Sequence, residues 1–301
     1  FSSINTDQLF RFSVILFFIS LISLFLVPII GIEVKGSKRW IDLFFLPRFQ
    51  PIEVLKPFLI VMLATILSSN RNYNLYLKYL LSIILISIVS LLLIMQPDIG
   101  QTFLIIFSWA VLIFTSGINI FFLFVFFFMA MVFLTYLIIY VPKFDYIQGR
   151  IFSFFNRETG THNFQSDKAI ESIASGGFFG KGIGEGTLKN RVPEAHTDYI
   201  ISVISEEFGV IIVLAIMIIL LILFYNILKK INNEDDDKVK LILVGAGSII
   251  LFQTFIHIGV NIRLLPTTGM TLPFLSYGGS SIISTSILSG IVLNLTKRKI
   301  N

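Results

Sequence analysis

The sequence of 301 residues contains no cysteine, and charged residues make up only 14% of it. The absence of cysteine excludes disulfide bonds, thiol nucleophiles and cysteine-based metal sites. Soluble domains contain about 25% charged residues, and disordered chains combine low hydrophobicity with high charge. Here 55% of the residues are apolar, and the mean hydropathy is +0.88. The composition therefore indicates a membrane protein with several spans, whose apolar surface faces lipid.

Eight apolar segments are long enough to cross a membrane as helices, which takes about 20 residues. They show no polar face, which a helix of a soluble bundle would have, and no strand-like alternation, which a β-barrel would have. We therefore predict an all-α polytopic membrane protein that forms one membrane domain over residues 1–301. Its large outer loop is expected at 142–197, and its spans at about 9–29, 53–69, 77–95, 99–117, 119–141, 198–228, 240–260 and 276–295.

The connecting segments fall into two sets, one on each side of the membrane. Short segments of the set that includes both termini carry more Lys and Arg than those of the other set. Because short cytoplasmic loops are enriched in these residues, we place both termini in the cytoplasm. The distinctive polar residues then lie outside, where we expect any chemistry. The net charge of +5 is a sign of this topology and of anionic ligands, and not of nucleic acid.

A cluster of bases beside a tryptophan follows the first span and consists of Lys35, Lys38, Arg39, Trp40 and then Arg48. Such a cluster could bind the phosphate of a lipid head group. It could equally be an aromatic anchor at the membrane surface, with bases that extend toward water.

Glu53 and Lys56 lie three residues apart at the start of the next span, on one face of the predicted helix. A charged pair at membrane depth is costly and usually has a role. Structural pairing explains these residues at least as well as catalysis does, so we expect an ion pair.

The outer loop contains a glycine-rich run at 176–186, followed by Glu194, His196 and Asp198. No strand precedes the run, so a dinucleotide-binding site is rejected. The glycines could let the loop approach a sugar or phosphate closely, or they could belong to a flexible loop. His196 and Asp198 alone are weak evidence for a metal site.

Asp198 is the candidate general base, because it lies where an aqueous loop meets an apolar helix. Partial loss of water would make this carboxylate a better base near neutral pH. In a helix that continued from this point, Ser202 and Ser205 would share its face. An acid placed at the start of a helix by the helix dipole is the alternative, and spacing alone favours it.

Residues 261–281 contain two prolines and three glycines around the start of the last span. Irregular backbone is tolerated at membrane depth only where it is buried in protein or lines a cavity. We therefore expect a re-entrant or broken element here, beside a polar cavity that opens outward.

Together these segments resemble the SEDS family, the polytopic peptidoglycan glycosyltransferases of shape, elongation, division and sporulation. The resemblance rests on six motifs in family order: Lys35-Gly36 with Lys38-Arg39-Trp40-Ile41, Gln50-Pro51 with Glu53 and Lys56, Gln96-Pro97-Asp98-Ile99-Gly100, Pro193-Glu194 with His196-Thr197-Asp198, Glu206-Glu207-Phe208-Gly209, and Leu272-Pro273-Phe274 with Ser276-Tyr277-Gly278-Gly279-Ser280-Ser281. The residues at 35–36, 195 and 270–273 place the chain nearer the division branch than the elongation branch. Family members have ten spans, so the resemblance implies that two N-terminal spans are missing before Phe1.

The resemblance implies an inverting polymerase of lipid II, the disaccharide-pentapeptide on undecaprenyl pyrophosphate. It would act at the outer face of the bacterial cytoplasmic membrane, during septal wall synthesis, with a class B penicillin-binding transpeptidase and divisome proteins as partners. Asp198 would be the catalytic base. Lys35, Lys38, Arg39 and Arg48 would bind the pyrophosphate; a divalent cation (Mg²⁺ or Mn²⁺) could share that task, although no ligand set is evident. The other substrate-binding candidates are Trp40, Glu194, His196, Ser276, Gly278, Gly279 and Ser280.

Two alternatives come from other functional classes. A lipid II flippase or transporter would need a cavity that opens inward and charges along a path through the membrane, and the charge-free centres of the spans disfavour it. A scaffold that only recruits a transpeptidase is disfavoured by the acidic and basic residues of the outer loops.

Overall fold

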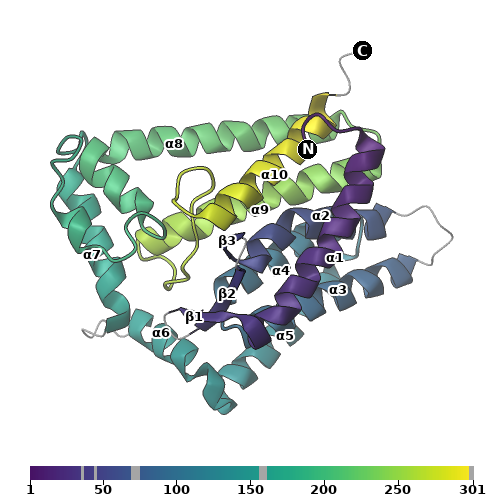
Figure 1. Cartoon of the computed structure of the whole chain (residues 1–301), viewed down its shortest axis with the longest axis horizontal. Helices are drawn as coiled ribbons and strands as arrows, with labels where there is room; N and C mark the ends of the chain where they lie inside the picture. Colours follow the sequence, from purple (N-terminus) through teal and green to yellow (C-terminus); the bar gives the residue numbers. More distant parts are fainter. Residues whose placement is uncertain (35–36, 44–45, 69–74, 156–160, 298–301) are drawn as a thin grey trace. The chain divides into compact units, whose positions relative to one another are not determined.

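The computed structural model describes residues 1–34, 37–43, 46–68, 75–155 and 161–297. Ten α-helices, two short 3₁₀ helices and three strands are seen in this part of the chain (Figure 1). In chain order they are α1 (Thr6–Ile30), β1 (Ile32–Val34), β2 (Ser37–Leu43), β3 (Leu46–Phe49), α2 (Pro51–Ser68), α3 (Leu75–Met95), α4 (Ile99–Thr115), α5 (Ile120–Tyr140), η1 (Pro142–Phe144), α6 (Asp145–Phe155), α7 (Thr161–Gly176), η2 (Leu188–Arg191), α8 (Ile200–Asn232), α9 (Asp237–Asn261) and α10 (Gly279–Lys297).

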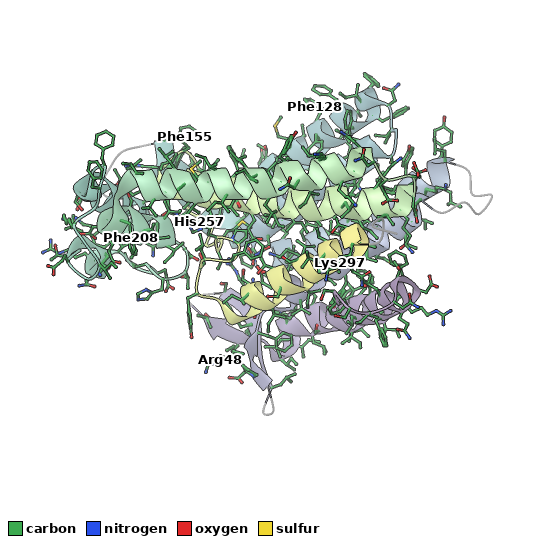
Figure 2. All side chains as sticks on the ribbon, turned by 90° about the horizontal axis from the view of Figure 1, so that it is seen from above. Arg48, Phe128, Phe155, Phe208, His257 and Lys297 are labelled. Atoms are coloured by element: carbon green, nitrogen blue, oxygen red, sulfur yellow. The ribbon has the colours of Figure 1, made fainter. Side chains whose placement is uncertain are left out.

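A helix lies at each position where the sequence predicts a span. Seven of the helices are long and apolar enough to cross a membrane, and α4 is a shorter apolar helix of 17 residues. α5 has no buried residue, and Phe128 on it is 52% exposed (Figure 2). An apolar helix exposed all round is suited to lipid. The predicted helical, polytopic membrane fold is therefore confirmed.

A small sheet lies in the segment that the hydropathy pattern leaves as a loop. Its strands are antiparallel in the order β1-β2-β3, with Ile32 opposite Trp40 and Ile41 opposite Phe49. Aromatic and β-branched residues favour such cross-strand pairs. The segment at 142–197, which is predicted to be a large outer loop, is partly helical, because it contains α6 and α7. These elements add to the all-α fold without changing its class.

Contacts divide the chain into two compact units, and each is described by itself. Unit 1 comprises residues 1–118, 224–252 and 278–301, and unit 2 comprises residues 119–223 and 253–277. The long helices α8 and α9 contribute to both units. That the whole chain forms one membrane domain stays a prediction.

The core of unit 1 is built around α2, which α1 and α10 both contact. Leu55, Leu59 and Leu63 of α2 are each 1% exposed or less. α9 also approaches α2 closely, since a Cβ atom on Gly245 would overlap the side chain of Ile60. Glycine at this position therefore permits a helix contact that a larger residue would block.

The charged pair at the start of α2 is buried within unit 1. The ammonium nitrogen of Lys56 lies 2.8 Å from the carboxylate of Glu53, and their side chains are 2% and 5% exposed. Gln101 of α4 donates a hydrogen bond of 2.6 Å to the same carboxylate. The structure thus contains the Glu53–Lys56 ion pair expected from the spacing, and Gln101 connects it to a second helix.

In unit 2 the glycine-rich run is bound to a break in α8. Gly209 has φ of 81° and ψ of 170°, so the predicted span at 198–228 is not one continuous helix. The amides of Val210 and Ile211 donate to the carbonyls of Gly177 and Phe178 instead of to their own helix. In return, the amides of Lys181 and Gly182 donate to the carbonyls of residues 206 and 207. Loop and helix thus exchange the hydrogen bonds that the break removes.

The buried carboxylate of Glu206 on α8 also binds this loop. Glu206 is 0% exposed, and it accepts hydrogen bonds from the amides of Leu188 (2.9 Å) and Lys189 (2.6 Å) and from the Ser172 hydroxyl (3.0 Å). Lys181 forms an ion pair with it at 3.4 Å. These contacts hold the run in place. Gly176, Gly180 and Gly186 pack closely against residues 205–207, whereas Gly177, Gly182 and Gly184 have positive φ angles that favour glycine.

Replacing Lys56 with Ala should leave the Glu53 carboxylate buried without its charged partner. Breaking a buried ion pair in this way costs about 3–5 kcal/mol. Unfolding of the detergent-solubilised protein would measure this loss. Lys240→Ala is the matched control, because Lys240 and Asp237 form an i,i+3 pair that is 35% and 82% exposed, and exposed pairs contribute at most about 1 kcal/mol. Equal losses in both variants would contradict the buried role.

Replacing Glu206 with Ala should release the loop at 177–191, because the part-buried amides of Leu188 and Lys189 lose their acceptor. Each such group costs about 1–3 kcal/mol. Limited proteolysis should then cut this loop faster than in the parent protein. Glu185→Ala serves as the comparison, since Glu185 is exposed in the same loop. A loop that stays resistant in Glu206→Ala would show that the carboxylate does not hold it.

Candidate active site

Asp198 lies in a tight turn directly before α8, and its side chain is half-buried. The amides of Thr197, Asp198 and Tyr199 all donate to the carbonyl of Glu194, at 3.1, 3.1 and 3.3 Å. Glu194 itself has φ of 57°. Because α8 begins only at Ile200, Asp198 does not share a helix face with Ser202 and Ser205. The turn, and not the helix, sets its direction.

The irregular segment between α9 and α10 forms a second wall beside this turn. The Ser276 hydroxyl donates to the carbonyl of Thr197 (2.6 Å), and the amide of Tyr277 donates to the carbonyl of His196 (2.9 Å). The backbone of Gly269 lies next to the Asp198 carboxylate, since a Cβ atom there would be 3.4 Å from Oδ2. The broken element predicted from the sequence is therefore present, and it borders the candidate base.

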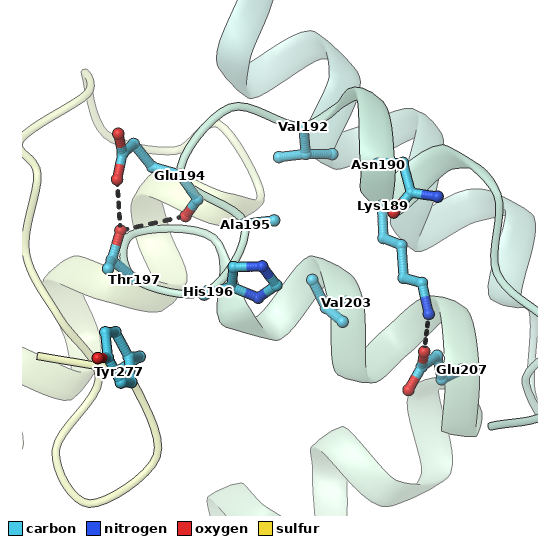
Figure 3. A pocket seen from close by; sticks show the side chains of 10 residues that line it. All are labelled: Lys189, Asn190, Val192, Glu194, Ala195, His196, Thr197, Val203, Glu207 and Tyr277. Atoms are coloured by element: carbon cyan, nitrogen blue, oxygen red, sulfur yellow. Dashed lines mark hydrogen bonds and ion pairs between the residues drawn. The ribbon is translucent and has the colours of Figure 1, made fainter. Parts of the chain in front are cut away.

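A pocket of about 670 Å³ in unit 2 is lined in part by the residues of the turn from Glu194 to Thr197, directly before Asp198 (Figure 3). Thr197, the residue before Asp198, is in its wall, and Tyr277, which is 76% exposed, lies at one side. Its lining residues are Lys189, Asn190, Val192, Glu194, Ala195, His196, Thr197, Val203, Glu207 and Tyr277. The two candidate substrate-binding residues of the turn, Glu194 and His196, therefore line one pocket.

Four of the charged and polar side chains that line the pocket are paired with one another. Glu194 accepts a hydrogen bond of 3.1 Å from the Thr197 hydroxyl, and Lys189 forms an ion pair with Glu207 (Figure 3). Sequence reasoning did not select Lys189, Glu207 or Tyr277 as site residues. A signal was present, because Glu207 and Tyr277 lie within two of the six motifs.

The base cluster belongs to unit 1, where its members have different surroundings. Arg39 is only 19% exposed and forms an ion pair of 3.9 Å with Asp98. Its guanidinium also donates to the carbonyls of Gln96 and Pro97. Arg39 is therefore engaged in the structure of the turn between α3 and α4.

Lys38 and Arg48 are exposed on the sheet, and Trp40 beside them is half-buried. Arg48, labelled in Figure 2, is 66% exposed and pairs at 2.9 Å with Asp42, which is 42% exposed. These two bases are accessible to an anion, whereas Arg39 is largely occupied. Lys35 lies outside the described residues.

The start of α10 also belongs to unit 1. Gly279 is its first residue, and Gly278 precedes it. The Ser280 hydroxyl accepts a hydrogen bond of 2.9 Å from the backbone amide of Gln50. Gln50 in turn donates to the carboxylate of Asp98 (2.9 Å). Burial raises the pKa of the Asp98 carboxyl, while the charge of Arg39 and the amide of Gln101 oppose the shift. Ser280 therefore has a structural partner, and it is not positioned by the helix alone.

The predicted residues thus form two groups, each gathered within its own unit. Unit 2 brings Glu194, His196, Asp198 and Ser276 together, and unit 1 holds the remaining described candidates. In the part of the chain that the structure describes, no three His, Asp or Glu side chains are grouped so as to hold a metal ion. The described residues therefore supply no ligand set for the divalent cation considered above.

Comparisons with known proteins place this arrangement in a family. A family model described as "Cell cycle protein", for FtsW, RodA and SpoVE, matches residues 1–301. A probable peptidoglycan glycosyltransferase FtsW of Caulobacter vibrioides is 32% identical over 276 residues, which are 91% of this chain and 69% of that protein. The FtsW of Nitrosomonas europaea, with the same description, is 34% identical over 285 residues, or 92% of this chain and 72% of that protein.

Solved structures agree with this result. RodA of Thermus thermophilus, a rod shape determining protein, superposes with a TM-score of 0.71 at 28% identity, covering 99% of this chain and 82% of that one. A chain of a peptidoglycan synthase complex, studied for the coordination of polymerization and crosslinking, gives a TM-score of 0.80 at 27% identity, covering 98% and 84%. The protein described here belongs to the FtsW/RodA/SpoVE family.

Proposed function

We propose that this multi-pass membrane protein is a peptidoglycan glycosyltransferase that polymerises lipid II into glycan strands. The observation that carries the proposal is the setting of Asp198. Its carboxylate is half-buried against the backbone of Gly269, in a turn that also forms the wall of an open pocket. Relatives at 32–34% identity over most of the chain are named peptidoglycan glycosyltransferases, and this supports the same chemistry here.

The chemistry requires one base and a stabilised leaving group. Asp198 accepts the proton of the GlcNAc 4-hydroxyl of the acceptor, and the freed oxygen forms a bond to the anomeric carbon of a lipid-linked MurNAc. The bond from that carbon to the pyrophosphate breaks with inversion, and undecaprenyl pyrophosphate leaves with the electron pair. General base catalysis by a positioned carboxylate contributes typically about 10²–10⁴ in rate. The leaving group is already an anion, so it needs positive charge more than a general acid.

Lys38 and Arg48 are the candidate bases for binding that anion, because both are exposed on the sheet of unit 1. Arg39 instead holds the turn at residues 96–98, so its part in substrate binding is indirect. Glu194, His196 and Tyr277 offer a carboxylate, an imidazole and an aromatic face around the pocket, which are groups that suit a sugar.

The site is proposed to face the outside of the cytoplasmic membrane, and the protein to act at the division septum. The excess of Lys and Arg in the opposite set of short loops supports this orientation. The similarity to a chain of a synthase complex supports a partnership with a class B penicillin-binding transpeptidase, and the similarity to FtsW proteins supports divisome partners.

Asp198→Asn should abolish polymer formation from fluorescent lipid II by the detergent-solubilised protein. The amide cannot accept the proton, so we expect a loss of about 10²–10⁴ in rate, with unchanged expression and melting temperature. The polymer made by the parent should form in the presence of penicillin. Detergent contains no bilayer to cross, so a flippase would make no polymer in this assay.

Glu171→Gln provides the control for loss of a carboxylate in the outer loop. Glu171 pairs with Lys168 on the surface of α7 and is 50% exposed, so this variant should polymerise at the parent rate. Activity retained by Asp198→Asn would reject the assigned base.

Replacing Lys38 and Arg48 together with Ala should weaken binding of the pyrophosphate. Both side chains are exposed, so we expect KM for lipid II to rise several-fold while the melting temperature stays within a few degrees of the parent. Arg39→Ala should instead lower the melting temperature, because it removes the contacts of the guanidinium group to residues 96–98. A KM unchanged by the double replacement would show that these bases do not contact the substrate.

A further inference from the structure

One face of α9 contacts the turn that carries the candidate base, Asp198. Gln253, His257 and Asn261 are spaced four residues apart on this helix, so they form a single row. Each is 1% exposed or less, although the helix is otherwise largely apolar. All three belong to unit 2, as do Asp198 and the irregular segment that follows α9. Such a polar row in a span requires partners inside the protein.

Asn261 connects α9 to the turn that carries Asp198. Its Nδ2 atom donates to the carbonyl of Asp198 at 3.0 Å and to the carbonyl of His257 at 2.9 Å. Both hydrogens of the amide are therefore used, one on the turn and one on its own helix. The main chain of Asp198 is fixed at its amide by Glu194 and at its carbonyl by Asn261.

His257 connects the same helix to the irregular segment between α9 and α10. Its Nδ1 atom lies 2.7 Å from the carbonyl oxygen of Met270. A carbonyl can only accept, so Nδ1 carries the hydrogen. Met270 directly follows Gly269, the residue that borders the Asp198 carboxylate. Gln253 continues the connection one turn away by donating to the carbonyl of Thr271 at 2.9 Å.

Two atoms of this polar row are expected to lower the stability of the folded protein. The Nε2 atom of His257 and the Oδ1 atom of Asn261 are buried, and neither has a hydrogen-bond partner among the described residues. Buried polar atoms without partners cost free energy. The other ends of both side chains, however, hold the two pieces of backbone between which the carboxylate lies.

We propose that His257 and Asn261 are positioning residues that set the place of the Asp198 carboxylate by holding the turn before α8 and the Gly269–Met270 backbone to one face of α9. The inference rests on the proposed function for its catalytic consequence. Neither residue touches the substrate. A reacting group displaced by about 1 Å can lose about 100-fold in rate, so these contacts affect turnover more than binding.

The two ring nitrogens of His257 can be tested separately. An Asn side chain places its amide nitrogen near the position of Nδ1, whereas a Gln side chain reaches toward Nε2. We expect His257→Asn to keep kcat within about threefold of the parent. His257→Gln and Asn261→Asp should lower kcat at least tenfold while KM for lipid II changes less than threefold. Phe255→Leu on the same helix is the control, since Phe255 is 64% exposed, and it should behave as the parent.

The absence of cysteine provides a second measurement that does not depend on activity. In Asp198→Cys the new thiol is the only one in the chain, and its rate of modification by a water-soluble thiosulfonate reports how closely position 198 is enclosed. Adding His257→Gln or Asn261→Asp should raise this rate at least threefold, and adding His257→Asn or Phe255→Leu should not. Melting temperatures of all variants would identify any that simply unfold.

Equal kcat values for His257→Gln and His257→Asn would overturn the proposal, as would labelling rates unaffected by His257→Gln and Asn261→Asp. The two hypotheses fail differently. If Asp198→Asn still polymerises lipid II, the proposed base is wrong, yet the labelling rates still decide whether α9 holds the turn.

Discussion

Polar atoms that are removed from water must find their partners inside the protein, and this constraint shapes both units. In unit 2, four donors from three segments converge on the fully buried carboxylate of Glu206. In unit 1, Glu53, Lys56 and Gln101 form a similar buried group. Each group joins segments that are distant in the sequence. The Glu206 group therefore ties the loop at 177–191 to the helices beside it, and the Glu53 group ties α2 to α4.

The spans could be predicted from the sequence because length and hydropathy alone determine whether a helix crosses a bilayer. The small sheet could not, since its strands are short and its register shifts near residues 32–33 and 41–43. The break at Gly209 was also missed. A single glycine inside a helical pattern costs only about 1 kcal/mol, so nothing local distinguishes a break from a tolerated residue.

The candidate site shows the same division between local and distant information. Asp198 is a candidate because it lies at the boundary between a polar loop and an apolar span, but spacing alone favours a structural acid, and the family resemblance supplies its catalytic role. Its surroundings could not be predicted, because they come from Asn261 and Gly269, whose contacts depend on how distant segments pack. The sequence does show polar residues four apart in an otherwise apolar span, at Gln253, His257 and Asn261. This spacing indicates that they share a helix face, but it does not indicate what that face contacts. Likewise, four bases in one segment looked equivalent, although Arg39 is bound to the turn at 96–98 and Arg48 is exposed.

The exchange of hydrogen bonds at Gly209 has a mechanical consequence. The amides of residues 210 and 211 already bind the loop, and the carbonyls of residues 206 and 207 already accept from it. The loop at 177–191 is therefore hydrogen-bonded to α8 on both sides of Gly209, and it braces the break, so the short helical piece that follows Asp198 is tied to the rest of α8 through this loop.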